Sequence, residues 1–265
     1  LGIPVVYYIS PKIWAWKEYR IKKIKNYVRK MVCILPFEKK WYEKRGVKAE
    51  FVGNPLIDRY EPVTSLRYSE KEIVKPKIGL FPGSRAQEID SLLPNMIESV
   101  RQLRKQYKTA EAIVAMAPGF DFSSYKDEYS HSWLKWEEGQ NEWIMRESDL
   151  LIMASGTAVL EATIVNTPAI VVYKVSSITY WLVKLFIKVD YIALPNIIAN
   201  EEILPELIQK EAEPDNILKY AKNLLHNPEQ RQTMKEKMAE VTQQLGPKGV
   251  ARRAAKVIID RLNSL

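Results

Sequence analysis

Short apolar runs alternate with amphipathic stretches through the middle of this 265-residue chain. The expected strands and the helices between them lie at Ile78–Phe81, 88–107, Ala112–Ala117, 141–147, Leu150–Ala154, 157–165 and Ala169–Tyr173. Strands that alternate with helices form a parallel sheet, because right-handed crossovers carry the chain from each strand to the next. The sequence therefore predicts an α/β, Rossmann-like domain.

Two of these strands end in a glycine turn that leads directly into a helix. The turns are Gly83-Ser84-Arg85 and Ser155-Gly156-Thr157. Ligands of parallel sheets bind at the carboxyl ends of the strands, and helix N-termini attract anions. The Arg85 guanidinium can also hold a phosphate through two hydrogen bonds. Each turn alone is equally well explained as a capped helix start, but together they predict a nucleotide-diphosphate pocket.

One acidic residue accompanies the second turn. Glu161 lies four residues after Thr157, on the same face of the expected helix and among apolar neighbours. A carboxylate in such surroundings needs hydrogen-bond donors, and the two hydroxyls of a ribose would supply them. The chain lacks both the lysine of a P-loop and the spacing of a dinucleotide fingerprint, which disfavours ATPases and dehydrogenases.

The net charge of +8 is unevenly distributed. Between Lys12 and Lys48, basic residues far outnumber the acids Glu18, Glu38 and Glu43. Such a segment suits phosphates, anionic lipids or nucleic acid, or is simply a solvated helix face. With Cys33 alone and only two histidines, we expect neither a disulfide framework nor a metal site.

The first 60 residues predict a partial fold. A strand at 4–9 opens the chain, a basic helix is expected at 15–30, and further strands at 31–36 and 49–52. A chain that opens on a core strand indicates a domain whose first part is missing. We expect three parts: a domain remnant at 1–60, a nucleotide-binding domain at 61–245, and a C-terminal helix at 246–265 that packs back on the first part or pairs with a second subunit.

Two aromatic segments allow more than one interpretation. The stretch at 7–16 contains Trp14 and Trp16, and it forms either a packed corner of the core or the wall of a cleft for sugar or acyl chains. The apolar segment at 178–198 is interrupted by charged residues, so it cannot span a bilayer as one helix. A buried helix is the default for it, and a membrane-facing patch the alternative.

Five stretches together resemble the lipid-A-disaccharide synthase family, which has the GT-B fold and forms glycosyltransferase family 19. They are YYISPKIWAWKEYRIKKIK (7–25), PFEKKWYEKRGVKAEFVGNPLID (36–58), FPGSRAQEIDSLLP (81–94), ASGTAVLEATIVNTPAIVVYK (154–174) and TYWLVKLFIKVDYIALPNIIAN (179–200). The resemblance implies one complete Rossmann-like donor domain and a partial N-terminal acceptor domain.

The resemblance also implies a reaction and its site. A UDP-linked 2,3-diacylglucosamine would be transferred to 2,3-diacylglucosamine 1-phosphate with inversion, with release of UDP and without metal or cofactor. The residues implied at the UDP site are Gly83, Ser84, Arg85, Ser155, Gly156, Thr157, Glu161 and Asn196. Those implied on the acceptor or membrane side, at the cytoplasmic face of the inner membrane, are Trp14, Trp16, Arg20, Asn54, Trp181, Lys184 and Lys188.

This chain differs from the family pattern in two respects. Asn54 stands where the family usually has histidine, so it can form hydrogen bonds but cannot titrate near neutral pH. The family's proposed general base lies in the N-terminal portion, so we assign no catalytic residue. The alternatives are another UDP-sugar enzyme of the GT-B type, such as an epimerase, and a non-catalytic subunit that binds UDP-sugar and works with a separate N-terminal polypeptide. No nucleic-acid partner is expected.

Overall fold

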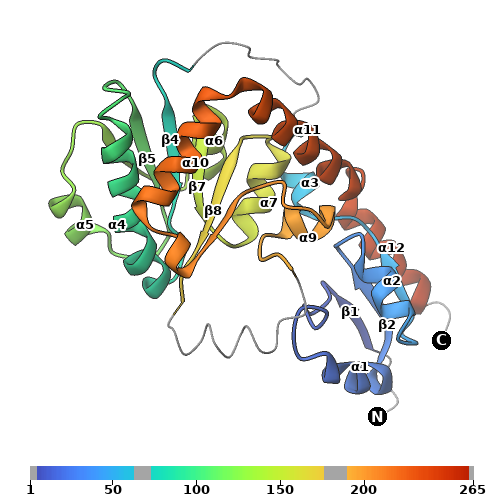
Figure 1. Cartoon of the computed structure of the whole chain (residues 1–265). Helices are drawn as coiled ribbons and strands as arrows, with labels where there is room; N and C mark the ends of the chain where they lie inside the picture. The colour runs from blue at the N-terminus through green and yellow to red at the C-terminus, as the bar shows by residue number, and fades with distance from the viewer. Residues whose placement is uncertain (1–4, 63–72, 176–189, 263–265) are drawn as a thin grey trace.

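The computed structural model describes residues 5–62, 73–175 and 190–262, which form two parallel sheets (Figure 1). The larger sheet has the strand order β6-β5-β4-β7-β8-β9 and the smaller one the order β1-β2-β3. Their bounds are β1 Val5–Tyr8, β2 Val28–Cys33, β3 Ala49–Phe51, β4 Lys77–Phe81, β5 Glu111–Met116, β6 Leu134–Glu138, β7 Leu150–Ala154, β8 Ala169–Tyr173 and β9 Glu206–Ile208. The α/β class and the parallel sheets confirm the fold expected from the sequence.

Helices cover both faces of the larger sheet. The bounds are α4 Ala86–Leu103, α5 Ser123–Glu128, α6 Asn141–Glu147, α7 Thr157–Ile164, α9 Leu194–Ala199, α10 Pro214–His226 and α11 Pro228–Gln244. Helices α4 and α10 pack side by side on one face (Figure 1). Right-handed crossovers in this strand order place α6 and α7 on the other face.

The direction in which strands are added reverses at the middle of the larger sheet. From β4 the chain moves through α4 to β5 on one side, whereas from β7 it moves through α7 to β8 on the other. Strands β4 and β7 are neighbours, and Phe81 pairs with Met153 near their carboxyl ends. A parallel sheet has a crevice where the chain direction reverses in this way. Both glycine turns lie at this crevice.

The smaller sheet is accompanied by four short helices. They are the 3-10 helix η1 Glu18–Arg20 and the α-helices α1 Ile21–Tyr27, α2 Glu38–Glu43 and α3 Leu56–Arg59. The helix expected over 15–30 is therefore shorter than predicted. Val28 fits the apolar stripe of that helix, but it begins β2 and pairs with Val5 of β1. Strand pairing across the sheet overrides the local helical pattern here.

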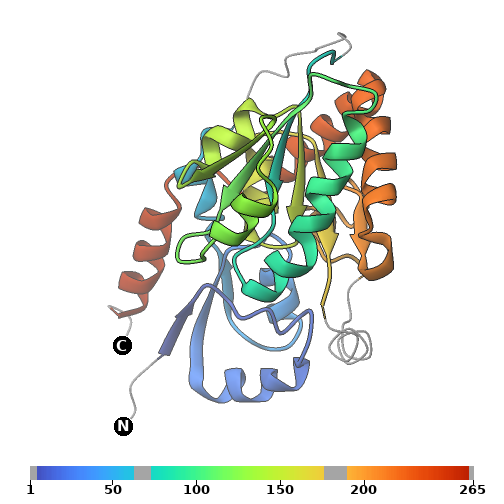
Figure 2. The same cartoon turned by 90° about the vertical axis from the view of Figure 1, so that its left-hand side faces the viewer.

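The last helix, α12 Val250–Leu262, returns to the smaller sheet (Figure 2). Val250 and Ala254 form a buried cluster with Val32 and Val52 of the N-terminal part. Gly53 (φ +94°) makes the close approach possible, because a Cβ there would lie 3.1 Å from the carbonyl oxygen of Leu245.

The two sheets share one continuous core. Trp14, Leu35, Ile57 and Tyr60 from the N-terminal part belong to the same buried cluster as the strands of the larger sheet. The amphipathic helices of the described ranges are all too short or too polar to cross a bilayer.

Candidate functional site

A cavity of about 340 Å³ lies where β4, β5 and β7 end. Its walls bring the two glycine turns together, although some 70 residues of sequence separate them. The lining residues include all six predicted from the turns, namely Gly83, Ser84, Arg85, Ser155, Gly156 and Thr157. The arrangement expected from the strand ends is therefore present, and its suitability for phosphate depends on the details of each turn.

The first turn depends on a glycine with an unusual backbone conformation. Gly83 has φ +100°, and a Cβ there would lie 2.6 Å from Oε2 of Glu88. Arg85 lies at the rim of the cavity, where its side chain is 82% exposed and its Nη1 donates a 2.9 Å hydrogen bond to Oε1 of Glu88. Because a guanidinium has five N–H groups, Arg85 keeps donors for a ligand while Glu88 holds it in place.

The backbone conformation of the second turn does not require the glycine that it contains. Gly156 is extended (φ 177°, ψ −164°), a conformation that any residue can adopt. A Cβ added there would meet no atom of the described residues within 4 Å, and Gly156 lines the cavity. The glycine therefore keeps space free where a ligand can approach the backbone.

Neither turn is a helix cap of the ordinary kind. Within the part of the chain that the structure describes, the residues at the N-cap positions, Arg85 and Gly156, give no side-chain cap to the first N–H groups of α4 or of α7. The interpretation of each turn as a capped helix start is therefore wrong. Uncapped N–H groups at the start of a helix bind anions, and the first residues of α7 line the cavity.

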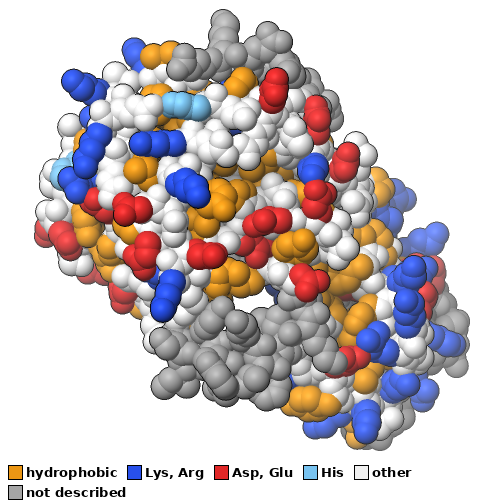
Figure 3. Space-filling model, viewed as in Figure 1, with side chains coloured by type: hydrophobic (Ala, Val, Ile, Leu, Met, Phe, Trp, Pro, Cys, Tyr) orange, Lys and Arg blue, Asp and Glu red, His pale blue; other side chains and the backbone are white. Residues whose placement is uncertain are grey.

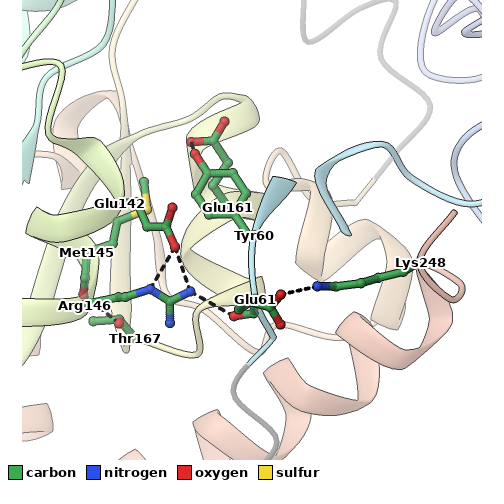
Figure 4. A network of polar contacts seen from close by, with 8 residues as sticks. All are labelled: Tyr60, Glu61, Glu142, Met145, Arg146, Glu161, Thr167 and Lys248. Atoms are coloured by element: carbon green, nitrogen blue, oxygen red, sulfur yellow. Dashed lines mark hydrogen bonds and ion pairs between the residues drawn. The ribbon is translucent and has the colours of Figure 1, made fainter. Parts of the chain in front are cut away.

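Glu161 has a partner inside the protein that the sequence did not reveal. Oε2 of Glu161 accepts a 2.8 Å hydrogen bond from the hydroxyl of Tyr60, at the end of α3 (Figure 4). Tyr60 is only 1% exposed, and burial, followed by the hydrogen bond to Glu161, raises the pKa of its phenol. The phenol thus stays protonated and donates. Glu161 lies one helical turn beyond the cavity, and a ribose contact stays a prediction.

Further polar contacts fix the segment around Tyr60. Figure 4 shows Arg146 of α6 donating to Glu142 and to the carbonyl oxygen of Glu61, at 2.9 Å for the latter. The Glu61 carboxylate also pairs with Lys248, just before α12. These contacts hold the end of α3 against the larger sheet, and with it the Tyr60 hydroxyl.

Asn196 has a structural role that differs from the one expected. Its side chain is fully buried and makes four hydrogen bonds within the protein. Nδ2 donates to the carbonyl oxygen of Leu204 and to Glu206, each at 2.8 Å, and Oδ1 accepts from the N–H groups of Ile203 and Leu204. With every donor and acceptor used, this side chain is not available to UDP and instead ties α9 to β9.

The residues expected on the acceptor or membrane side are not all at the surface. Trp16, 48% exposed, and Arg20 lie on the surface. Trp14 was expected among them but is buried, and its Nε1 donates a 3.0 Å hydrogen bond to Glu38. The 7–16 stretch is therefore in part a packed corner of the core. Trp181, Lys184 and Lys188 lie outside the described residues.

A second cavity, of about 260 Å³, lies between the two sheets. Thr157 lines both this cavity and the one at the glycine turns. Asn54 also lines it, with Oδ1 accepting from the N–H of Leu56 at 3.1 Å. The structure thus brings Asn54 close to the second glycine turn, a relationship that spacing in the sequence could not indicate.

Glu38 is a buried carboxylate at this second cavity. It is 1% exposed and accepts hydrogen bonds from Trp14 Nε1 and from the N–H groups of Ile34 and Leu35. Burial raises its pKa, and these hydrogen bonds, together with the neighbouring Ser10 hydroxyl, oppose the rise. In the sequence, Glu38 stands out only as one of the few acids in a basic segment.

Across the described ranges, no cluster of His, Cys, Asp and Glu could hold a metal ion.

The chain is similar to known proteins over almost its whole length. Residues 2–259 match the family described as "Lipid-A-disaccharide synthetase". The lipid-A-disaccharide synthase of Myxococcus xanthus is 37% identical over 268 residues, covering 99% of this chain and 70% of the relative. That of Nitrosococcus oceani is 38% identical over 272 residues, covering 99% and 69%.

Solved structures show the same fold. The UDP-GlcNAc 2-epimerase of Neisseria meningitidis, bound to UDP-GlcNAc, matches with a TM-score of 0.61 at 16% identity, covering 99% of this chain and 70% of that one. The S. aureus MnaA–UDP structure matches with a TM-score of 0.63 at 16% identity, covering 92% and 62%. The glycosyltransferase of kitacinnamycin gives 0.61 at 10% identity, covering 98% and 71%. The chain belongs to the lipid-A-disaccharide synthase family, and its two parallel sheets have the GT-B glycosyltransferase fold.

Proposed function

We propose that this chain carries the UDP-sugar donor site of a glycosyltransferase of lipid A biosynthesis. The reaction is the transfer of 2,3-diacylglucosamine from UDP to 2,3-diacylglucosamine 1-phosphate, with inversion and release of UDP. The observation that carries the proposal is the convergence of both glycine turns, with two uncapped helix starts and Arg85, on one cavity. Family membership supports the acylated substrates.

The groups around the cavity of the glycine turns can stabilise UDP as it leaves the sugar. Negative charge grows on the UDP oxygens as the bond to the sugar breaks. The uncapped N-terminus of α7 and the Arg85 guanidinium supply fixed positive potential beside that charge. Glu161, one turn further along α7, would accept hydrogen bonds from the ribose hydroxyls, with Tyr60 fixing the carboxylate through its own hydrogen bond.

Calorimetric titration with UDP tests the donor site. Arg85→Ala removes a charge-assisted contact to phosphate, so we expect UDP to bind about tenfold more weakly or worse. Arg101→Ala is a matched control, because Arg101 also lies on the surface of α4 and pairs with a glutamate three residues away, Glu98. Arg101 is near the far end of α4, so its loss should leave UDP affinity unchanged.

Two results would contradict the donor-site proposal. One is the absence of UDP binding by folded wild-type protein. The other is an equal effect of Arg85→Ala and Arg101→Ala, which would show that only the overall charge of the helix matters.

We propose in addition that the N-terminal part binds the anionic cytoplasmic face of the inner membrane. Lys and Arg side chains gather over this part in Figure 3, and α1 contributes exposed Lys22, Lys23 and Lys25. Tyr19 and Tyr27, 69% and 70% exposed, lie among them. Cationic side chains interleaved with aromatic rings suit the headgroup region of an anionic bilayer.

A further inference from the structure

The cavity of the glycine turns has an acid in its wall. Among the described residues that line this cavity, Arg85 carries a positive charge, Glu88 carries a negative charge, and the others are uncharged. The two charges offset each other, so the attraction for a diphosphate comes largely from the uncapped starts of α4 and α7. A carboxylate in the wall of such a site weakens the binding of an anion by repulsion.

The Glu88 carboxylate lies against the first glycine turn. Its side chain is 18% exposed, compared with 82% for Arg85. Oε1 accepts the hydrogen bond from Arg85, and Oε2 lies 2.6 Å from the point that a Cβ of Gly83 would occupy. The same point is 3.4 Å from Cβ of Ala154, the last residue of β7. The carboxylate is therefore in the crevice where β4 and β7 end.

Helix stability alone would also favour an acid at this position. Glu88 belongs to the first turn of α4, where a negative charge stabilises the helix through its dipole. The charge of Glu88 nevertheless acts beyond its own helix. Burial, followed by the nearby charge of Glu88, raises the pKa of the Tyr173 phenol at the end of β8, whereas Arg85 lowers it. A ligand bound at these strand ends lies within reach of the same charge.

A nucleotide sugar and the free nucleotide differ in the charge that this carboxylate meets. In a UDP-sugar both phosphates are esterified, and together they carry about two negative charges. Loss of the sugar leaves a free terminal phosphate, whose second ionisation has a pKa of about 6, so free UDP carries about three negative charges at pH 8. Repulsion by Glu88 is therefore stronger for free UDP than for the UDP-sugar.

We propose that Glu88 is a specificity-determining residue of the donor site, which disfavours a nucleoside diphosphate with a free terminal phosphate relative to one whose terminal phosphate is esterified. The site retains the sugar-loaded donor and releases the nucleotide once the sugar has left. The hydrogen bond from Arg85 holds the carboxylate in the position that this discrimination requires. The inference rests on the proposed UDP site.

The test compares UDP with the methyl ester of its terminal phosphate, by calorimetric titration of the full chain at pH 8. The two ligands differ by one methyl group and one negative charge, so contacts to a sugar do not contribute. Glu88→Gln keeps the size of the side chain and removes its charge. We expect this variant to lower the ratio of the Kd for UDP to the Kd for the methyl ester by about three- to tenfold. Glu88→Asp keeps the charge and should leave that ratio within about twofold of the wild-type value.

Glu98→Gln is the matched control. Glu98 also lies on α4 and pairs with an arginine three residues away, Arg101, but it is near the far end of the helix. Glu98→Gln should leave both Kd values unchanged. A purely structural role of Glu88 would lower Tm in Glu88→Gln and change both Kd values by the same factor, which leaves their ratio as in the wild type.

The outcomes separate this inference from the proposal beneath it. Failure of the wild-type protein to bind UDP would overturn the donor site. Normal UDP binding with an unchanged ratio in Glu88→Gln would leave the donor site intact and overturn the role of Glu88. An equal fall of the ratio in Glu98→Gln or in Glu88→Asp would overturn it as well. So would a wild-type protein that binds UDP but not the methyl ester, because its site would then require the free terminal phosphate.

Discussion

The Tyr60 hydroxyl donates a 2.8 Å hydrogen bond to Oε2 of Glu161, from the end of α3 to the middle of α7. The carboxylate proposed to hold the ribose is therefore oriented by a residue of the N-terminal part. Since burial raises the pKa of the Tyr60 phenol, the donor is present throughout the neutral range.

Tyr60→Phe tests this relationship. The variant leaves the partly buried carboxylate one donor short, so we expect the free energy of unfolding to fall by about 1–2 kcal/mol. Urea denaturation measures the change. UDP should still bind within about threefold of wild type, while Glu161→Ala should cost about tenfold or more in UDP affinity. If Tyr60→Phe instead weakened UDP binding more than Glu161→Ala, the ribose would not bind at Glu161.

Gly156→Ala tests whether Gly156 is needed to leave space for a ligand or to allow its backbone conformation. The backbone is extended and a Cβ meets none of the atoms that the structure describes within 4 Å, so we expect an unchanged or slightly higher Tm. Because Gly156 lines the nucleotide cavity, the same methyl group should weaken UDP binding by about tenfold or more. Gly79→Ala is the contrast, because its Cβ would lie 2.6 Å from Cδ2 of Leu151 and should lower Tm. Unaltered UDP binding by Gly156→Ala would show that phosphate does not approach this turn.

Cys33, the single cysteine of the chain, reports on the small sheet. It is fully buried in β2, and burial, followed by the nearby charge of Glu38, raises the pKa of its thiol to about 12. Because the thiolate is the reactive form, we expect no reaction with Ellman's reagent at pH 8 in the native protein, and one thiol per chain in guanidinium chloride. Rapid native labelling would mean that this sheet opens readily.

Asp58 links α3 to the start of α12 and predicts a pH dependence. Its carboxylate accepts hydrogen bonds from the N–H groups of Gly249 and Ala251. Slight burial tends to raise its pKa, but these backbone bonds outweigh it, and the folded pKa lies below the ordinary 3.8. A depressed folded pKa stabilises the native state above the unfolded pKa, and the benefit is lost as pH falls through the folded pKa.

Asp58→Asn should therefore destabilise the protein at pH 7 more than at pH 3. We expect a loss of about 1 kcal/mol or less at pH 7, since the carboxylate is exposed and screened by solvent. Urea denaturation at the two pH values measures it, with Asp127→Asn on α5 as an exposed control. If the loss of stability were equal at both pH values, the charge of the Asp58 carboxylate at the start of α12 would not be its cause.

Charge reversal on α1 tests the membrane proposal. Lys22→Glu combined with Lys23→Glu should weaken binding to vesicles with anionic lipids by at least about tenfold, because each lysine near the surface contributes about 1 kcal/mol. Sedimentation with the vesicles at low and high salt measures this. The control pair Lys105→Glu and Lys108→Glu carries the same charge change on the larger domain. Equal losses for both pairs would indicate a nonspecific charge effect.

The central strands could be predicted because their residues are apolar without interruption. All five residues of β7 are buried, so burial and sequence pattern agree there. Strand β6 lies at the edge of the sheet with mixed burial, and its sequence carried no clear pattern. Val28 was assigned to a helix because only its pairing with Val5, far away in sequence, makes it a strand residue.

The parts of the site that short sequence motifs encode could be predicted. The two turns are readable as short motifs, and the common edge of a parallel sheet predicts that they meet. The hydrogen bond from Tyr60 to Glu161 depends on how the two sheets pack. Trp14 illustrates the same limit, because the buried carboxylate that accepts its indole N–H is 24 residues away.

Because α12 returns to the smaller sheet, the backbone crosses between the smaller and the larger sheet twice, once after Tyr60 and once before Val250. The ion pair between Glu61 and Lys248 fastens these two passages to each other. The two crossings are therefore held at one place, and the Tyr60 hydroxyl that orients Glu161 lies next to the first of them.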